Sequence, residues 1–431
     1  MLLIRTMEEA QLKIESMAFR GYGVARIDGQ VLFVPHSVVG DQGWVKVIQK
    51  KKGYAIGRLI KLIKPSPFRS DPVCPLFGQC GGCQWQHIHH PAQIDLKKEI
   101  LREILIKLAG LKEVPSIEGQ PSPQSYGYRS RVQLKVEGKA IGYYRERSHH
   151  LVNVDRCPIS HPLINQILSL LQKESTSLSQ VKEIRINVSP VEGKGVLLLH
   201  PTSFHQRMKD HLNDLLKAHP VLKGIAVVSK GGSVFLGDPH LNFTISLTQG
   251  QERREFWLRA SAKSFSQVNL EMNQILIEMV LQFSGVRKDE NVLDLYAGVG
   301  NFTLPLALLS KESWGIEENP SAVEDARFNK ERNRVTNGNL LHGRVEDILP
   351  HWAGPRPQLV ILDPPRRGGK AILDQVVRLK PERVIYVSCE PTTFSRDLRL
   401  FSEAGYQLQK LGLIDMFPQT YHMEVIGLLT P

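Results

Sequence analysis

Leu359-Val-Ile-Leu-Asp363-Pro-Pro-Arg366 and Arg383-Val-Ile-Tyr-Val-Ser-Cys389-Glu-Pro391 are two short apolar runs that each end at a reactive side chain. Continuous runs of this kind are typical of parallel strands that are buried on both faces. Because ligands of an open α/β sheet bind beyond the carboxyl ends of its strands, we expect Asp363 and Cys389 to face one pocket. A carboxylate and a thiol there indicate covalent catalysis, whereas the ordinary alternative for Cys389 is a packed core cysteine.

The pattern around these two runs predicts the rest of the sheet. Further β-type runs occupy residues 291–295, 313–316 and 423–426, and helical patterns separate them. This alternation predicts an α/β domain with a parallel, doubly wound sheet over residues 263–431.

The chain ahead of this domain divides in two. Residues 1–64 alternate short β-type runs with glycine turns, which predicts a small β-barrel, and the proline-rich piece at 64–68 ends it. Residues 65–262 carry a mixed pattern that we interpret as an α+β central domain. The 431 residues are enough for three domains that each bury a core.

The charge of the chain is strongly positive, with a formal net value of +12. Residues 46–69 contain eight Lys or Arg and no Asp or Glu, so this run favours a polyanion, although a solvated basic face is the ordinary alternative. The chain begins without an apolar run of signal-peptide length, and no stretch is apolar enough to span a bilayer. We therefore expect a cytoplasmic protein with no membrane partner.

The five cysteines are an odd number, which in a reducing compartment favours metal or catalytic roles over disulfides. Cys74, Cys80 and Cys83 lie on one loop, and Cys157 follows from a distance. This spacing predicts a four-thiolate metal site. A structural zinc ion and an iron–sulfur cluster both fit it, because both take thiolate ligands.

A glycine-rich loop, Asp294-Leu-Tyr-Ala-Gly298-Val-Gly300-Asn301, ends one predicted strand and opens a helix, where the backbone can approach a ligand closely. Glu317 closes the next strand and is placed to bind the ribose hydroxyls of a nucleoside. A nicotinamide dinucleotide is the alternative, but the loop lacks the full G-x-G-x-x-G pattern. The arrangement is similar to the S-adenosyl-L-methionine site of class I methyltransferases. Asp347 ends a third strand and can meet the adenine, or it is a surface acid.

Together, these features resemble the RNA 5-methyluridine methyltransferases, and specifically the 23S ribosomal RNA branch with an N-terminal TRAM domain and an iron–sulfur cluster. The resemblance covers essentially the whole chain. The motifs that carry it are Cys74-Pro-Leu-Phe-Gly-Gln-Cys80-Gly-Gly-Cys83-Gln-Trp-Gln-His87, Phe265-Ser-Gln267-Val-Asn269, Asp294-Leu-Tyr-Ala-Gly298, Asp363-Pro-Pro-Arg366, Ser388-Cys-Glu-Pro391 and Asp415-Met-Phe-Pro-Gln-Thr-Tyr-His422-Met-Glu424.

The resemblance implies a Rossmann-like methyltransferase domain at 263–431, a TRAM-like RNA-binding barrel at 1–64, and a central domain at 65–262 that carries a 4Fe-4S cluster. Cys389 would be the nucleophile and Glu424 the base. The residues implied to bind the cluster are Cys74, Cys80, Cys83 and Cys157. Those implied to surround S-adenosylmethionine or the reacting atoms are Gln267, Tyr296, Asn301, Glu317, Asp347 and Asp363. The chain departs from the family pattern at Glu390, where many relatives have Asn, and at Tyr296, where some have Phe.

The chemistry explains why a thiol is required. Carbon 5 of uracil is a weak nucleophile until a thiolate adds to carbon 6, so Cys389 must ionise. Glu424 then removes the proton from carbon 5. Burial between apolar neighbours would raise its pKa, whereas the alternative is a surface glutamate on an edge strand. Asp363 has the alternative of a helix N-cap.

The expected reaction is methylation of a specific uridine in 23S ribosomal RNA through a covalent adduct, with the same chemistry on a tRNA T-loop uridine as the nearest alternative. The resemblance favours the ribosomal target because the dedicated bacterial tRNA enzymes lack the barrel and the cluster. Amino-group methylation and a non-catalytic iron–sulfur RNA-binding protein are the rivals. The target base must leave its stack, and the basic segments 129–131 and 143–147 can then contact RNA or remain solvated faces.

Overall fold

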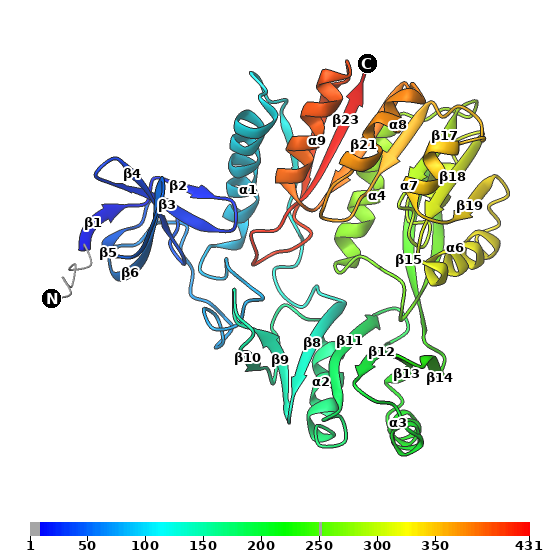
Figure 1. Ribbon diagram of the computed structural model, residues 1–431, viewed down its shortest axis with the longest axis horizontal. Helices are drawn as coiled ribbons and strands as arrows, with labels where there is room; N and C mark the ends of the chain where they lie inside the picture. The colour runs from blue at the N-terminus through cyan, green and yellow to red at the C-terminus, as the bar shows by residue number, and fades with distance from the viewer. Residues whose placement is uncertain (1–8, 250–251) are drawn as a thin grey trace.

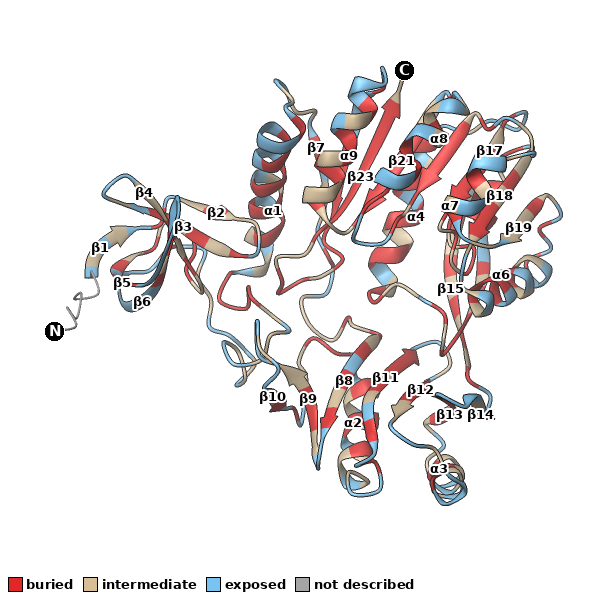
Figure 2. Ribbon diagram, in the orientation of Figure 1, coloured by how far each residue is buried: buried red, intermediate tan, exposed pale blue. Residues whose placement is uncertain are grey.

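The computed structural model describes residues 9–249 and 252–431, which form a small curved sheet, a central α+β unit and a large α/β unit (Figure 1). Figure 2 shows that the central strands of the large unit are buried along most of their length, whereas the outer faces of its helices are exposed. Within the described residues, no helix combines the length and apolar composition needed to cross a membrane.

The N-terminal unit is a six-stranded sheet with the order β1-β5-β6-β4-β3-β2. Its strands are β1 (Glu9–Lys13), β2 (Ser16–Ala18), β3 (Tyr22–Ile27), β4 (Gln30–Val34), β5 (Gln42–Lys51) and β6 (Tyr54–Lys64). Alternate residues such as Ala25, Leu32 and Val45 point inward and form a separate small core. Register shifts between β5 and β6 bend this pair, as β-bulges do. The predicted small barrel is thus confirmed.

The central unit is a seven-stranded sheet with the order β10-β9-β8-β11-β12-β13-β14. Its elements are β8 (Arg131–Glu137), β9 (Ala140–Tyr144), β10 (Leu151–Asn153), α2 (Pro162–Lys173), β11 (Val181–Ser189), β12 (Lys194–Pro201), α3 (Gln206–Ala218), β13 (Leu222–Ser229) and β14 (Gly232–Gly237). Both helices pack on one face of the sheet, where their apolar stripes share a core with Val132, Ile184 and Ile186.

The large unit is an eight-stranded sheet with the order β19-β18-β17-β20-β21-β23-β22-β7. Its strands are β7 (Ile117–Gln120), β17 (Asn291–Leu295), β18 (Glu312–Glu317), β19 (Gly338–His342), β20 (Leu359–Leu362), β21 (Arg383–Ser388), β22 (Gln407–Ile414) and β23 (Glu424–Thr430). Its α-helices are α1 (His90–Ile104), α4 (Leu270–Ser284), α5 (Thr303–Ala307), α6 (Pro320–Arg332), α7 (Val345–Ile348), α8 (Leu373–Arg378) and α9 (Pro391–Glu403). Shorter turns are a π-helical turn at Leu105–Ala109 and 3₁₀ turns at Leu349–His351 and Lys370–Ile372.

The expected α/β fold is confirmed, but the sheet is not entirely parallel. Strands β17 to β21 run parallel, whereas β23 runs antiparallel to both β21 and β22. The prediction that the run at 423–426 is another parallel strand was wrong. Only residues 415–423 connect β22 to β23, and this is too short for the crossover that a parallel neighbour requires.

Two segments that precede residue 263 also join the large unit. Strand β7 pairs with β22, and α1 packs its apolar face into the core of the sheet. The hairpin of β15 (His240–Gln249) and β16 (Glu252–Ser261) packs against α4. The predicted central domain at 65–262 is therefore not one structural unit. Its β8–β14 strands form the central sheet, whereas α1 and β7 pack with the sheet of the large unit.

Candidate active site

Cys389 and Asp363 emerge side by side from the sheet. Strands β20 and β21 are parallel neighbours, with Leu362 paired to Tyr386, and each residue follows the carboxyl end of its strand. Both side chains are only partly buried, so Cys389 is not a packed core cysteine. No helix begins at Asp363, since the next helical turn starts at Lys370, and the N-cap alternative is excluded.

Glu424 is the first residue of β23 and lies beside Cys389. Ser388 pairs with Val425 in the antiparallel register, so Cys389 and Glu424 stand one residue further along their strands. Strand β23 lies between β21 and β22, and Glu424 is only 3% exposed. The surface-glutamate alternative is thereby excluded, because β23 is an interior strand.

The electrostatics of this group favour protonated acids. Burial, and next the charge of Glu424, raise the pKa of the Cys389 thiol to about 12. Burial likewise raises the pKa of Glu424 well above its usual range, with Asp363 adding to it, and raises that of Asp363 to about 7. The charge of Arg366 opposes the pKa shifts of Cys389 and Glu424, and Arg366 donates a hydrogen bond to the thiol.

The start of helix α9 adds a second influence on the thiol. Pro391 is the first residue of α9, so Cys389 lies just before the helix N-terminus. Unpaired amides and the helix dipole stabilise negative charge at such a position. Arg366 and this helix terminus therefore both favour the thiolate.

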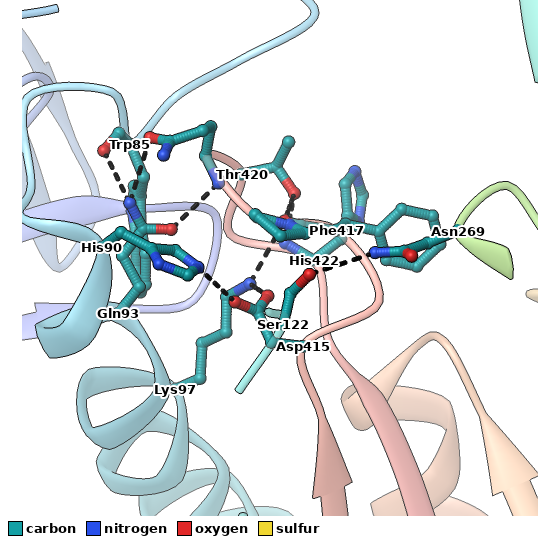
Figure 3. Close-up of polar contacts among 12 residues, drawn as sticks. Trp85, His90, Gln93, Lys97, Ser122, Asn269, Asp415, Phe417, Thr420 and His422 are labelled. Carbon is teal, nitrogen blue, oxygen red and sulfur yellow. Dashed lines mark hydrogen bonds and ion pairs between the residues drawn. The ribbon is translucent and has the colours of Figure 1, made fainter. Parts of the chain in front are cut away.

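The connection that leads into Glu424 is held by a buried ion pair. Lys97 of α1 is fully buried, and its Nζ lies 2.6 Å from Oδ1 of Asp415 (Figure 3). The ammonium also donates to the carbonyl of Phe417 at 3.3 Å, and His90 lies 3.7 Å from Asp415. Because neither charge reaches solvent, this pair determines where the residues after β22 can lie.

An amide pair continues this anchoring. Gln93 Nε2 donates to Gln419 Oε1 at 3.1 Å, and the backbone N–H of Gln419 donates back to Gln93 Oε1 at 2.9 Å. Gln419 adopts the left-handed backbone conformation, with a φ of 67°. Its carbonyl accepts from the amides of Gln84 and Trp85, which directly follow Cys83. The segment that carries Glu424 is thus bonded to the cysteine loop.

A cavity beside Asp363 matches the position expected for a nucleoside cofactor. Gln267, Tyr296, Asn301 and Asp363 line it, together with apolar residues of the β15–β16 hairpin. The loop after β17 curves tightly around it, since Tyr296, Gly298 and Gly300 all have positive φ angles. The side-chain amides of Asn301 and Asn273 bond to each other at 3.0 Å.

Two carboxylates accept hydrogen bonds at or next to the loop after β17. Glu317 accepts hydrogen bonds from the amides of Gly298, at 2.9 Å, and Asn319, at 2.7 Å. Asp294 is fully buried, accepts from the hydroxyl of Thr303 at 2.5 Å, and has a pKa raised to about 7, chiefly by burial. Among the described residues, its Oδ1 atom has no hydrogen-bond partner.

Asp347 stands apart from this group. It is exposed on α7 and does not line the cavity. The neighbouring Glu346 is partly buried instead, where it accepts from the Tyr296 hydroxyl at 3.5 Å and from Arg367 at 2.8 Å. Glu317 also lies outside the cavity lining, although its carboxylate binds the loop that forms it.

The four N-terminal cysteines meet around a second cavity of about 350 Å³. All four side chains are partly buried, and burial raises the pKa of the Cys80 thiol to about 11 and that of Cys83 to about 12. Arg366 and His422 line the same cavity, so it adjoins the active site. Over residues 9–249 and 252–431, no three Cys, His, Asp or Glu side chains are grouped closely enough for a single metal ion.

Comparison with known proteins agrees with this geometry. The family model described as tRNA (uracil-5-)-methyltransferase matches residues 89–430, and the TRAM domain model matches residues 7–60. The chain belongs to this methyltransferase family. The predicted resemblance to RNA 5-methyluridine methyltransferases with a TRAM domain is thereby confirmed.

Similar proteins match this chain over nearly its full length. An uncharacterized RNA methyltransferase of Aquifex aeolicus is 34% identical over 97% of this chain and 98% of its own length, and one of Bacillus cereus is 31% identical over 96% and 95%. The structure of a Pyrococcus abyssi tRNA (uracil-54, C5)-methyltransferase in complex with S-adenosyl-L-homocysteine has a TM-score of 0.73 and 23% identity. It covers 97% of this chain and 99% of its own, which shows that the fold is shared.

Several residues at this methyltransferase site are not evident from sequence patterns. Arg366 was visible only as the end of a motif, yet it bonds to the thiol. Lys97 and Gln93 are more than 300 residues from the segment they hold, and no periodicity links them to it. A lysine on the apolar face of a helix is the one available signal, because lysine is rarely buried without a partner.

Proposed function

We propose that this chain transfers a methyl group from S-adenosylmethionine to carbon 5 of a uridine in RNA, through a covalent adduct of Cys389. One observation carries the proposal: a thiol, a buried carboxylate and a guanidinium meet beyond the ends of β21, β23 and β20, next to a cavity lined by the motifs of the family.

Cys389 acts as the nucleophile in this reaction and Glu424 as the base. The Cys389 thiol releases its proton to solvent and its sulfur bonds to carbon 6, which moves the electron pair of the 5,6 double bond onto carbon 5. Carbon 5 then bonds to the methyl group of the donor sulfonium, whose sulfur–methyl bond breaks with the electron pair staying on the sulfur of the neutral thioether that leaves. The Glu424 carboxylate removes the remaining proton on carbon 5, the double bond re-forms, and the thiolate leaves. The raised pKa of Glu424 makes it a stronger base than an exposed glutamate.

The cavity beside Asp363 fits the methyl donor. Gln267, Tyr296, Asn301 and Asp363 would contact it, and Glu317 would act through the amides it holds or bind the ribose directly. The positive φ angles of Tyr296, Gly298 and Gly300 turn the loop so that these residues or their neighbours line the cavity. The donor supplies a methyl group on a positively charged sulfur. Asp347 keeps its proposed contact with the adenine only if α7 moves.

We assign the four-cysteine cavity to a 4Fe-4S cluster. Four thiols line one cavity but, among the described residues, are not grouped closely enough for a single metal ion, and thiolates are the ligands that a larger iron–sulfur cluster also takes. The cluster would join the loop of Cys74, Cys80 and Cys83 to Cys157 and thus hold the residues after Cys83. Purified protein should be brown and contain iron and sulfide, whereas colourless protein with one zinc ion would disprove the assignment.

For the RNA, we propose 23S ribosomal RNA, bound in part by the basic TRAM barrel. A tRNA uridine is the second candidate, favoured by the full-length structural match to an enzyme that is named for uracil 54 of tRNA. Mass-spectrometric mapping of 5-methyluridine in ribosomal RNA and tRNA from a strain that lacks the gene separates the two. A methyl lost from neither RNA would reject both.

The reaction itself is tested by transfer of a labelled methyl group to RNA. Wild-type protein should label RNA and form a covalent complex with 5-fluorouridine RNA, and Cys389→Ala should do neither. Normal turnover by Cys389→Ala would favour amino-group methylation and overturn the covalent route. RNA binding without any transfer would support a non-catalytic iron–sulfur protein.

A further inference from the structure

One face of the central sheet packs against the β15–β16 hairpin and Ala322 of α6 at β12 and β13, whereas its β8 and β11 part carries polar side chains. Helices α2 and α3 pack against the face that carries Val132, Ile184 and Ile186. Strand residues alternate between faces, so Arg131, Gln133 and Lys135 of β8 point the other way. The pairing of β8 with β11 places Glu183, Arg185 and Asn187 beside them. Gln133 is exposed, so the face reaches solvent at this position, and Gln133 and Lys135 also border the four-cysteine cavity.

The charge of this face is positive and not neutralised. Its acid, Glu183, is engaged by Lys135 at 2.5 Å and by Arg185 at 3.2 Å. In the part of the chain that the structure describes, Arg131 has no carboxylate within ion-pair distance. Its pKa is lowered to about 10 by burial and by the like charges of Arg185 and Arg129. A guanidinium held among other cations is a site prepared for an anion.

Unpaired polar atoms gather on the same face. The Nη1 of Arg131, the Oδ1 of Asn187 and the Nε2 of His200 are all buried and, among the described residues, have no hydrogen-bond partner. Asn187 pairs directly with Arg131, and His200 pairs with Glu183. Buried polar groups without partners are uncommon in folded proteins. Three of them on neighbouring strands indicate a ligand that supplies both acceptors and donors.

This face leads directly to the active site. The guanidinium of Arg131 stacks on the ring of Phe265 at 5.1 Å, and Phe265 is 55% exposed and lines the cavity that also contains Asp363. The amide of Ser130 donates to the carbonyl of Val268 at 2.7 Å, next to Gln267. A phosphate bound at Arg131 would therefore lie beside the cavity that contains Asp363.

We propose that the open β8–β11 face is the docking surface for the RNA strand that enters the active site, and that Arg131 binds a phosphate of this strand in a bidentate manner. Arg129 and Arg185 flank it and add charge, while Asn187 and His200 bond to ribose or base groups. This inference rests on the proposed function, because it assigns the path of the same RNA substrate. Phosphate contacts of this kind fix the register of the strand without reading its sequence.

The test compares Arg131→Gln with Arg207→Gln, which removes an exposed arginine from α3 on the covered side of the same sheet. The probe is RNA from a strain that lacks the gene, in the fraction that wild-type protein methylates. For Arg131→Gln we expect a roughly tenfold higher KM for RNA with kcat within about twofold, and a salt-dependence slope reduced by about one. Arg207→Gln should match wild type in all three.

Two further measurements exclude other roles for Arg131. Affinity for S-adenosylhomocysteine, measured by calorimetry, should not change, and the melting temperature of Arg131→Gln should equal or exceed that of wild type, because an unneutralised buried charge is removed. Arg131→Lys keeps the positive charge but loses the bidentate guanidinium, so its KM for RNA should lie between those of wild type and Arg131→Gln. An unchanged KM and slope, or a loss of S-adenosylhomocysteine affinity, would overturn the inference. Absence of methyl transfer by wild-type protein would instead reject the proposed function.

Discussion

Arg366→Met should make Cys389 markedly less reactive, because Arg366 is the side chain that opposes the raised pKa of this thiol. A hydrogen bond from a charged donor contributes about 1.5–3 kcal/mol. Arg366 is exposed, so solvent screening reduces this to roughly 1–1.5 kcal/mol, or about one pKa unit. At a fixed pH below the thiol pKa, the thiolate fraction should therefore fall about tenfold.

The assay is alkylation of Cys389 by iodoacetamide in the purified protein, followed by site-resolved mass spectrometry between pH 7 and 10. Since only the thiolate reacts, the wild-type rate should rise about tenfold per pH unit over this range without a plateau. Arg367→Met is the matched control, because Arg367 bonds to Glu346 instead. Equal rates for Arg366→Met and wild type, or an equal loss in Arg367→Met, would refute the reasoning.

Three other predictions concern the base, the buried ion pair and the cysteine loop. Glu424→Gln should still bond to RNA and accept methyl but not release product, so a covalent complex with ordinary RNA should accumulate on a denaturing gel; free turnover would contradict this. Asp415→Asn should destabilise the protein by about 3–5 kcal/mol in urea unfolding because Lys97 stays buried without a counter-charge, and Lys97→Met with Asp415→Leu should restore most of the loss. Gly81→Ala should lower the iron content of purified protein, because a Cβ there would lie 2.9 Å from backbone atoms of Tyr144 and Glu146. Gly78→Ala is the control, since its Cβ meets no atom within 4 Å and the positive φ of Gly78 is the only source of strain.

Sequence patterns are sufficient to predict which segments are strands, but not the direction in which each strand runs. The runs at 359–362 and 383–388 are strands because a short apolar run that includes Val and Ile is typical of a strand buried on both faces, and this is a local property. The direction of β23 is not local. It depends on the length of the connection from β22 and on the partners available at the sheet, so the periodicity of residues 423–426 could not reveal it.

The candidate site divides in the same way. The glycine loop, the cysteine spacing and the Asp363 motif are contiguous or nearly so, and each residue type carries a recognisable chemistry. Asp347 illustrates the limit, since the strand pattern brings two acids to the end of β19, and only the turn into α7 decides that Glu346 faces Tyr296 while Asp347 faces solvent.

The sequence alone indicated the class of fold, the order of the three units and the thiol that we expect to react, because these depend on residue type and short-range spacing. The tertiary structure decided that Glu424 is an interior carboxylate, that Arg366 bonds to Cys389, and that Lys97 and Gln93 hold the segment leading to the base. Each of these is a contact between distant parts of the chain. Such contacts form when separate apolar faces are buried together, and no local pattern of residues encodes which polar groups then meet.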